Sequence, residues 1–315
     1  MLRHLAAVAV LAAAQTAASV PSVDEAALLR DLQVLSADDM AGRKPGTAGH
    51  ARARRFIAGR FAASGLEPMS SGFEQSFPGG ANVTGRIRGS RRADRSIAIT
   101  AHYDHLGVVN GEVFNGADDN ASGTAGLIAL AAHFRRSPPA HTLVFGALDL
   151  EEANGRGARV FVEALEAGRT AVVLNVNLDM IARDATNTLY AAGTSHYPFL
   201  KPYLERVAAR APVGLRFGHD GPGAPAIADW TRDSDHYAFH RRGIPFVYFG
   251  VEDPVHHHKV TDDYDTITHR FFVDAVRTIA DAVTEFDTHA EAILRQRAAT
   301  GRRPPGPSRP DRGKR

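Results

Sequence analysis

Acidic residues and histidines recur along this chain directly after apolar runs. The runs have the length and composition of strands buried inside a sheet, and they alternate with segments of helical periodicity. This alternation predicts a single three-layer αβα domain, with helices on both faces of a mostly parallel, mixed sheet. The carboxyl ends of parallel strands meet at one edge, so the residues that follow the runs should lie close together. They are His102-Tyr103-Asp104, Asp118-Asp119-Asn120-Ala121-Ser122-Gly123, Glu151-Glu152, Asn177-Leu178-Asp179-Met180 and His256-His257-His258.

The same periodicities predict where the elements begin and end. Expected strands cover 82–88, 96–101, 142–148, 171–178, 188–192 and 244–249. Expected helices cover 24–35, 48–64, 122–134, a segment ending near 167, 196–210 and 270–294. No apolar run after the N-terminal one approaches the ~20 residues of a membrane span.

The N-terminus has the pattern of a signal peptide. Arg3 and His4 precede an apolar run from Leu5 to Ala14, and small residues follow it. That run is too short to span a bilayer, and small residues are typical of a cleavage site. We therefore expect 1–18 to be removed near Ala18, and the mature protein to be exported to the periplasm or secreted.

Charge and composition set the remaining bounds. The net charge is only +2, and much of the arginine behind the pI of about 9.0 lies between 295 and 315. The body, expected as one catalytic domain over 19–296, shows no concentration of arginine and aromatic residues, which argues against nucleic-acid binding. The segment 297–315 is rich in Gly, Pro and Arg and is expected to be a basic disordered tail.

The chain contains no cysteine. It therefore has no disulfide bonds, and any metal ion must be bound by histidine and carboxylate side chains. For zinc, that ligand set is typical of catalytic rather than structural sites.

Simple chemistry predicts the roles of His102 and Asp119. A metal-bound imidazole usually donates its other N–H to a carboxylate, so we expect Asp104, two residues on, to hold His102. Asp119 stands directly before a helix, where an aspartate is more often a cap. With Asp118 available for the cap or turn, Asp119 is free to bridge two metal ions.

Glu151 and Glu152 follow the run 142–148. Two adjacent negative charges there are costly unless cations neutralise them, so one should bind metal and the other accept a proton from water. Asp179, whose ordinary alternative role is a turn or cap, and one of the three late histidines complete the set. Each signal is weak alone. In chain order the set is a histidine, an aspartate, a glutamate, a second aspartate and a second histidine. Together these five residues predict a hydrolase with two adjacent zinc ions.

These segments, together with three others, make the chain resemble the zinc aminopeptidases of the bacterial leucyl aminopeptidase type. Glutamate carboxypeptidase II and glutaminyl cyclases are relatives of that family. The other segments are Met40-Ala41-Gly42-Arg43, Pro45-Gly46-Thr47, and Ser234-Asp235-His236 before Gly243-Ile244-Pro245. The resemblance covers most of the mature chain and implies an exopeptidase acting on peptides with a free N-terminus.

The resemblance also implies residue roles. His102 and Asp179 would hold one zinc ion, Glu152 and the late histidine the other, and Asp119 would bridge them. Glu151 would be the general base.

In this family an aspartate follows the late histidine ligand by four residues. His258 and Asp262 have that spacing, so we expect His258, with His256 as a weaker possibility. His257 stands where many relatives carry tyrosine.

Four alternatives to a zinc aminopeptidase follow from the same residues. Two-zinc acylases and carboxypeptidases insert a dimerisation domain of roughly a hundred residues before the last histidine, a typical domain size. Here only 79 positions separate Asp179 from His258, and sheet and helix already occupy them. A glutaminyl cyclase would use one zinc ion, and an inactive binding domain should have lost ligands, whereas this chain retains all five. A dipeptidase or carboxypeptidase on the same fold stays open.

Overall fold

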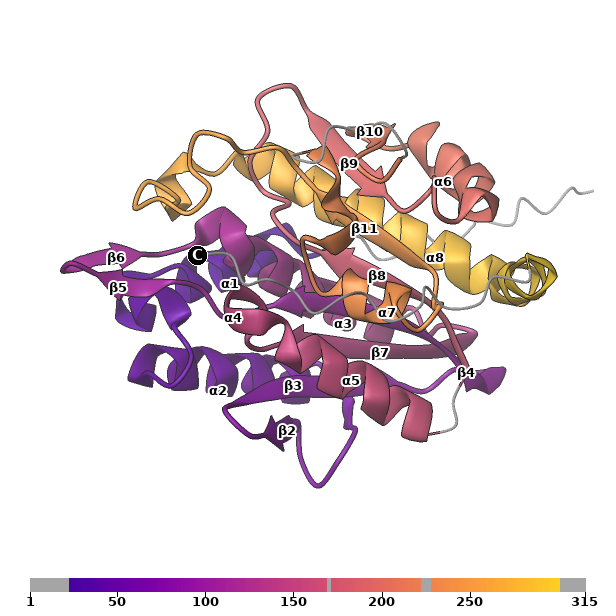
Figure 1. Ribbon diagram of the computed structural model, residues 1–315, viewed down its shortest axis with the longest axis horizontal. Helices are drawn as coiled ribbons and strands as arrows, with labels where there is room; N and C mark the ends of the chain where they lie inside the picture. Colours follow the sequence, from indigo (N-terminus) through magenta and orange to yellow (C-terminus); the bar gives the residue numbers. More distant parts are fainter. Residues whose placement is uncertain (1–22, 169–170, 222–227, 301–315) are drawn as a thin grey trace, which may run out of the picture.

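The computed structural model describes residues 23–168, 171–221 and 228–300. Within them a nine-stranded mixed sheet lies between two layers of helices (Figure 1). The fold class expected from the alternating pattern is therefore confirmed. None of the helices in these ranges is long and apolar enough to cross a membrane.

The helices and strands follow one another in this order. The first half contains α1 (Glu25–Leu35), a 3-10 turn (Asp38–Arg43), α2 (Ala48–Ala63), β1 (Glu67–Pro68), β2 (Glu74–Phe77), β3 (Gly80–Ile87), β4 (Arg92–His102), β5 (Gly107–Val109), β6 (Glu112–Phe114), a π-type turn (Ala117–Ser122), α3 (Gly123–Arg136) and β7 (His141–Leu148). The second half contains α4 (Glu151–Asn154), α5 (Arg156–Ala167), β8 (Ala171–Leu178), β9 (Thr188–Ala192), a 3-10 turn (Pro198–Leu200), α6 (Lys201–Ala208), β10 (Gly214–Phe217), a 3-10 turn (Trp230–Arg232), α7 (His236–His240), β11 (Phe246–Gly250), a 3-10 turn (Tyr264–Thr266) and α8 (His269–Ala299).

Four neighbouring strands at the centre of the sheet run parallel. The strand order is β1-β3-β7-β4-β8-β11-β9-β10, with β2 also paired to β3. Strand β4 is parallel to β7 and β8, and β11 is parallel to β8, whereas β3 and β9 join this group antiparallel. Because the four parallel strands point the same way, their carboxyl ends share one edge. The segments that begin at His102, Glu151, Asn177 and His256 lie at or after these ends, whereas the segment of Asp119 follows β6 and precedes α3.

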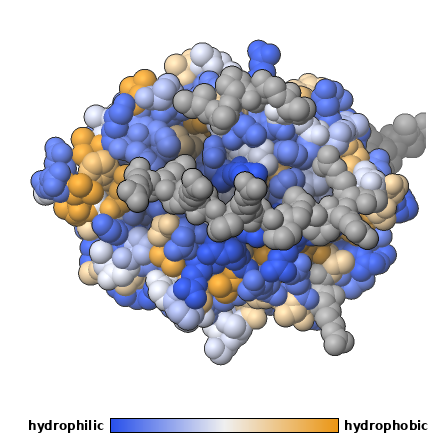
Figure 2. Space-filling view, in the orientation of Figure 1, coloured by the Kyte–Doolittle hydropathy of each residue, from blue (hydrophilic) through white to orange (hydrophobic). Residues whose placement is uncertain are grey.

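Both faces of the sheet are buried, which explains the continuous apolar runs. All eight residues of β7 are buried. On one face α5 and α7 pack around Phe161 and Phe239, while α1, α2, α3 and α8 cover the larger core on the other. The β5–β6 hairpin projects from this body at the left of Figure 1, and Figure 2 shows hydrophobic surface on that side. Val108 and Val109 of the hairpin are 47% and 39% exposed.

The expected elements agree with the structure where the local pattern is regular. The predicted bounds of β8 and β9 are those observed, while β1, β2, β5, β6, β10 and α7 were not predicted. The expected helix over 196–210 was wrong at its start, since α6 begins at Lys201. Pro198 disfavours helical backbone at the residue before it, and Pro202 fits only the first turn of a helix.

The two ends of the chain lie outside the described residues. Residues 1–18, expected as the signal peptide, lie outside them, as does the segment 301–315 of the expected tail. Helix α8 reaches Ala299, so the first residues of the segment predicted to be disordered, 297–299, are helical.

Candidate metal centre

His102 is the last residue of β4, and its imidazole is buried at the end of the sheet. Nδ1 lies 3.1 Å from the main-chain carbonyl oxygen of Asp104 and donates to it. Nε2 is thereby left to face two carboxylates, 3.3 Å from Asp179 Oδ1 and 3.4 Å from Asp119 Oδ1. The ring direction is therefore set by the loop that directly follows the strand.

Asp104 is close to His102, but its carboxylate has different partners from those expected. Its Oδ1 is 3.8 Å from Nδ1 of His102, beyond hydrogen-bond range. Instead Oδ1 and Oδ2 accept from the backbone N–H groups of Glu151 and Glu152, at 3.1 and 3.3 Å. The main-chain carbonyl competes successfully for His102 because it lies in the same turn, and the carboxylate is left to cap the N-terminus of α4.

Asp119 lies in the turn before α3 and is 3% exposed. Its two oxygens face different partners. Oδ1 is 3.4 Å from Nε2 of His102, and Oδ2 is 3.1 Å from Nε2 of His258. Burial opposes ionisation, but hydrogen bonds from His102, His257 and His258 hold the pKa of Asp119 well below its usual range. Asp119 is thus an ionised carboxylate with one oxygen toward each half of the site.

Asp179 directly follows β8, and its N–H donates to the carbonyl of Phe249 in β11. Asn120 connects this strand end to the turn of Asp119. Its Nδ2 donates to the carbonyl of Leu178, and its Oδ1 accepts from the N–H of Met180. These bonds bring Asp119 and Asp179 to the same place, although 60 positions separate them.

The three late histidines have separate environments. His258 Nε2 is 3.1 Å from Asp119 Oδ2 and 3.2 Å from Glu152 Oε2. His257 Nε2 is 3.4 Å from Asp119 Oδ2 and also reaches the site, half-exposed. His256 Nδ1 instead bonds to Thr261 Oγ1 at 3.0 Å. Of these three histidines, only His258 meets both Asp119 and Glu152.

Glu151 and Glu152 begin α4, and two residues separate them from the end of β7. Glu152 uses Oε2 toward His258 and Oε1 toward His105, and hydrogen bonds from these two histidines lower its pKa to about 2, against the effect of burial. Among the described residues no hydrogen bond or ion pair holds the carboxylate of Glu151. Burial raises its pKa well above the usual range. The lowered pKa of Glu152 suits a metal ligand, and the raised pKa of Glu151 suits a proton acceptor.

His105 belongs to the site but was not predicted. It is 1% exposed, with Nδ1 2.8 Å from Glu152 Oε1 and 3.7 Å from Asp119 Oδ2. The signal was present in the sequence, since His105 follows Asp104 in the same strand-end segment. Its neighbours His102 and Asp104 had already filled the expected ligand pattern.

The charge of this cluster fits bound cations. Six carboxylates interact electrostatically with one another: Asp104, Asp119, Glu151, Glu152, Asp179 and Asp235. Both oxygens of buried Asp235 lack hydrogen-bond partners among the described residues, and burial raises its pKa to about 7. Hydrogen bonding to Asp119 and Glu152 raises the pKa of His258 to about 10. Burying this much negative charge is costly unless positive charge balances it.

The distances fit zinc in particular. Ligand atoms about 2.0–2.1 Å from a tetrahedral ion lie roughly 3.3–3.4 Å from one another. His102 Nε2 is 3.3 and 3.4 Å from oxygens of Asp179 and Asp119. His258 Nε2 is 3.1 and 3.2 Å from oxygens of Asp119 and Glu152. Among the described residues, three groups of side chains could hold a metal ion, and all three contain Asp119: one with His102 and Asp179, one with His105 and Glu152, and one with His257 and His258.

Arg43 supplies a buried positive charge behind the site. Its side chain is fully buried and donates to the carbonyls of Leu35, Tyr103, Asn115 and Gly116 at 2.6–2.9 Å. Burial lowers its pKa to about 10, and Asp119 and Asp262 oppose that shift. The guanidinium thus ties together the segments on either side of the β5–β6 hairpin.

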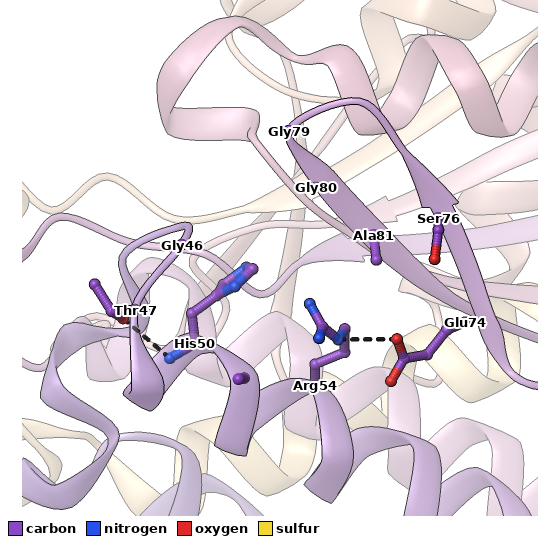
Figure 3. A pocket seen from close by; sticks show the side chains of 10 residues that line it. Gly46, Thr47, His50, Arg54, Glu74, Ser76, Gly79, Gly80 and Ala81 are labelled. Carbon is purple, nitrogen blue, oxygen red and sulfur yellow. Dashed lines mark hydrogen bonds and ion pairs between the residues drawn. The ribbon is translucent and has the colours of Figure 1, made fainter.

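A separate pocket of about 320 Å³ lies between α2 and the β2–β3 hairpin (Figure 3). Arg54 and Glu74 form an ion pair within it, with Nε 3.1 Å from Oε2. Nε2 of His50 in its lining donates to Oδ1 of Asp149, which also accepts from the N–H of Leu150. The pocket therefore lies behind the turn that presents Glu151 and contains none of the candidate ligands. Its lining residues are Gly46, Thr47, His50, Ala51, Arg54, Glu74, Ser76, Gly79, Gly80 and Ala81.

Residues 82–283 match the sequence profile of Peptidase family M28, which is more than half of the chain. The chain belongs to Peptidase family M28. The matched region contains every candidate ligand, and it agrees with the family resemblance inferred from the strand-end motifs.

Known proteins similar to this M28 chain include an enzyme and two solved structures. It is 28% identical over 246 residues to leupeptin-inactivating enzyme 1 of Streptomyces exfoliatus, covering 76% of this chain and 52% of that protein. The chain thus spans about half the length of that relative. A zinc aminopeptidase from Bacillus subtilis shares the fold with a TM-score of 0.68 at 16% identity, covering 85% of this chain and 96% of that one. A glutaminyl cyclase from Bacteroides thetaiotaomicron shares the fold with a TM-score of 0.66 at 18% identity. The match covers 84% of this chain and 99% of that one.

Proposed function

We propose that this M28 protein is an exported aminopeptidase that uses two zinc ions to hydrolyse N-terminal residues from peptides. The observation that carries the proposal is the position of Asp119. Its Oδ1 faces His102, which also meets Asp179, and its Oδ2 faces His258, which also meets Glu152. A shared carboxylate between two such groups is the ligand arrangement of a two-metal hydrolase. The similarity to a zinc aminopeptidase supports the same activity.

In this proposal five residues hold metal. His102 and Asp179 bind one zinc ion, Glu152 and His258 bind the other, and Asp119 binds both. Asp104 positions the pair of glutamates through their backbone N–H groups. Two zinc ions held by these residues would lower the pKa of a shared water molecule and polarise the scissile carbonyl group.

Glu151 is the proposed general base. Its carboxylate is not engaged by another described side chain, and burial raises its pKa well above the usual range. A base is most effective when its pKa lies near the working pH. Glu151 accepts a proton as water attacks the carbonyl carbon, and then delivers it to the nitrogen of the leaving amine.

A free N-terminus fits the charge of the site. Asp235 and Asp179 lie within electrostatic range of Glu151, and the buried cation Arg43 is committed to main-chain carbonyls. The excess negative charge attracts the ammonium group of a peptide. Export is proposed on the N-terminal pattern of Arg3, His4 and the apolar run after them.

Zinc content and substrate range test the proposal together. We expect two zinc ions per chain by elemental analysis after dialysis, and hydrolysis of leucine p-nitroanilide but not of its N-acetyl derivative. A chelator should abolish the activity and lower the melting temperature, because metal bound only to the native state stabilises it. Zinc should restore both.

Other results would point to the relatives. One zinc ion per chain with cyclisation of an N-terminal glutamine would indicate a glutaminyl cyclase. Cleavage only of dipeptides, or from the carboxyl end, would indicate a dipeptidase or carboxypeptidase on the same fold. Full zinc occupancy without hydrolysis of any peptide would contradict the proposal.

A further inference from the structure

His105 is a buried histidine of the centre that the proposed ligand set does not use. It lies in the loop between β4 and β5, with its ring fully enclosed. Its Nδ1 meets Oε1 of Glu152, while Oε2 of the same carboxylate faces His258. The two oxygens of Glu152 are therefore divided between two histidines.

The distances distinguish a hydrogen bond from shared metal binding. His105 Nδ1 is 2.8 Å from Glu152 Oε1, which is the length of an N–H···O⁻ hydrogen bond. Two ligands of one tetrahedral zinc would lie roughly 3.3–3.4 Å apart, as the His258 and Glu152 atoms nearly do at 3.2 Å. His105 Nδ1 lies 3.7 Å from Asp119 Oδ2, which is also longer than the spacing expected for two ligands of one zinc ion. His105 thus has the geometry of a donor to a ligand.

The second ring nitrogen indicates which tautomer is present. Nε2 of His105 is buried and has no hydrogen-bond partner among the described residues. A carboxylate oxygen can only accept, so the proton belongs on Nδ1, and Nε2 keeps its lone pair.

The ring is held where this bond requires it. Gly116 has φ +54°, and a Cβ there would lie 2.5 Å from Cδ2 of His105 and 2.1 Å from the carbonyl oxygen of Asp119. Glycine at this position lets the backbone approach the face of the ring. His105 therefore has little freedom to turn away from Glu152.

We propose that His105 is a positioning residue, which holds Glu152 through an Nδ1–H···Oε1 hydrogen bond and so directs Oε2 toward the metal shared with His258. This inference rests on the proposed function, because it assumes that Glu152 is a zinc ligand. Hydrogen bonds to ligating carboxylates typically change metal affinity by about 10–100-fold.

Two substitutions separate the hydrogen bond from the space that the ring fills. H105L removes the donor, whereas H105N keeps an amide N–H close to the position of Nδ1. Zinc affinity is measured by competition with a chromophoric chelator. We expect H105L to weaken one of two zinc sites by about 10–100-fold, and H105N to stay close to wild type.

His141 provides a matched control. It is also buried and also donates through Nδ1 to a carboxylate, Asp287 Oδ1 at 2.9 Å, but it lies at the opposite end of β7 from the site. H141L should lower thermal stability and leave both zinc affinities unchanged. If H105L does not fold, H105Q, whose amide stands nearer the position of Nε2, takes its place in the comparison with H105N.

The outcomes are separable. Failure of the proposed function appears in the wild type, as a chain that holds fewer than two zinc ions. Failure of this inference appears in the variants: wild-type zinc affinity in H105L, or equal loss in H105N and H105L, overturns the role of the Nδ1–H donor. A wild-type chain that bound no zinc would overturn both.

Discussion

The carboxylate of Asp262 accepts a hydrogen bond from the backbone N–H of Asp119, with N 3.0 Å from Oδ2. Its other oxygen accepts from the N–H of Asp118 and from Arg183 Nη2, both at 2.8 Å. Asp262 follows His258 by four residues, so one carboxylate fixes the turn of the bridging residue to the loop of the last histidine. The spacing that the sequence shows between His258 and Asp262 thus has a structural cause.

Asp262→Asn should therefore disturb the metal centre although it replaces no proposed ligand. An amide has only one accepting oxygen, so one buried backbone N–H loses its partner and Arg183 loses a charged one. An unsatisfied buried group costs about 1–3 kcal/mol, and breaking a buried ion pair about 3–5 kcal/mol. Urea unfolding of the metal-free protein, measured with a chelator present, should show a loss of unfolding free energy in this range. The variant should also bind zinc more weakly. Asp265→Asn, in the same loop but exposed, is the control and should change neither.

The paired glutamates should give opposite defects. Glu151→Gln removes the proposed base but no ligand, so both zinc ions should stay while kcat falls by about 10²–10⁴-fold. Glu152→Gln should weaken metal binding itself, since its Oε2 faces His258 and its Oε1 faces His105. Zinc content and kcat are measured on both variants. The reverse pattern would exchange the two roles.

The late histidines should separate by metal content. His258→Ala should empty one zinc site, because His258 is the one of these three histidines that meets both Asp119 and Glu152. His256→Ala should keep both ions, since its ring is bonded to Thr261. His257→Ala should keep metal and slow turnover, as its Nε2 reaches Asp119 from a half-exposed position. Loss of zinc in His256→Ala alone would show that the loop has a different register.

Arg43→Met should be among the most destabilising substitutions. It leaves four buried carbonyls without their donor and removes the cation behind the acidic cluster. We expect a loss of roughly 3–5 kcal/mol in the free energy of unfolding. Arg55→Met, on the exposed side of α2, should stay within about 0.5 kcal/mol of wild type. A small effect at Arg43 would mean that water replaces the guanidinium.

His236 should make the fold sensitive to acid. Burial lowers its pKa to about 3, whereas the pKa in an unfolded chain is about 6.5. The unfolded chain thus binds this proton first, and stability falls as the pH drops from about 6.5 toward 3. At pH 5 this one residue lowers the free energy of unfolding by about 2 kcal/mol.

His236→Gln keeps a donor for the carbonyl of Trp230 but does not titrate, so it should lose less stability between pH 7.5 and pH 5. Urea unfolding in a chelator measures both proteins without metal effects. The exposed His269→Gln is the control, and it should follow the wild-type pH dependence. Parallel curves for His236→Gln and wild type would contradict the prediction.

The sequence by itself determined the sheet and the residues at its edge. Burial on both faces requires continuous apolar runs such as 142–148 and 171–178, and this requirement acts on neighbouring residues, so it can be read locally. The parallel direction of the central strands then brings their ends together. For that reason the fold class was predictable, and so was the approach of the strand-end residues His102 and Asp179 to each other. Asp119 lies in the turn before α3, and contacts between distant segments bring it to them.

Only the tertiary structure decided which atoms meet. Asp104 was expected to hold the ring of His102, but its own main-chain carbonyl does so, and the carboxylate caps the turn of the glutamates. His105 carries no periodic signal, and its contact with Glu152 joins residues 47 positions apart. Asp262 reaches Asp119 across 143 positions. Hydrogen bonds depend on the direction of single side chains to within a few tenths of an ångström, and packing between distant segments sets that direction.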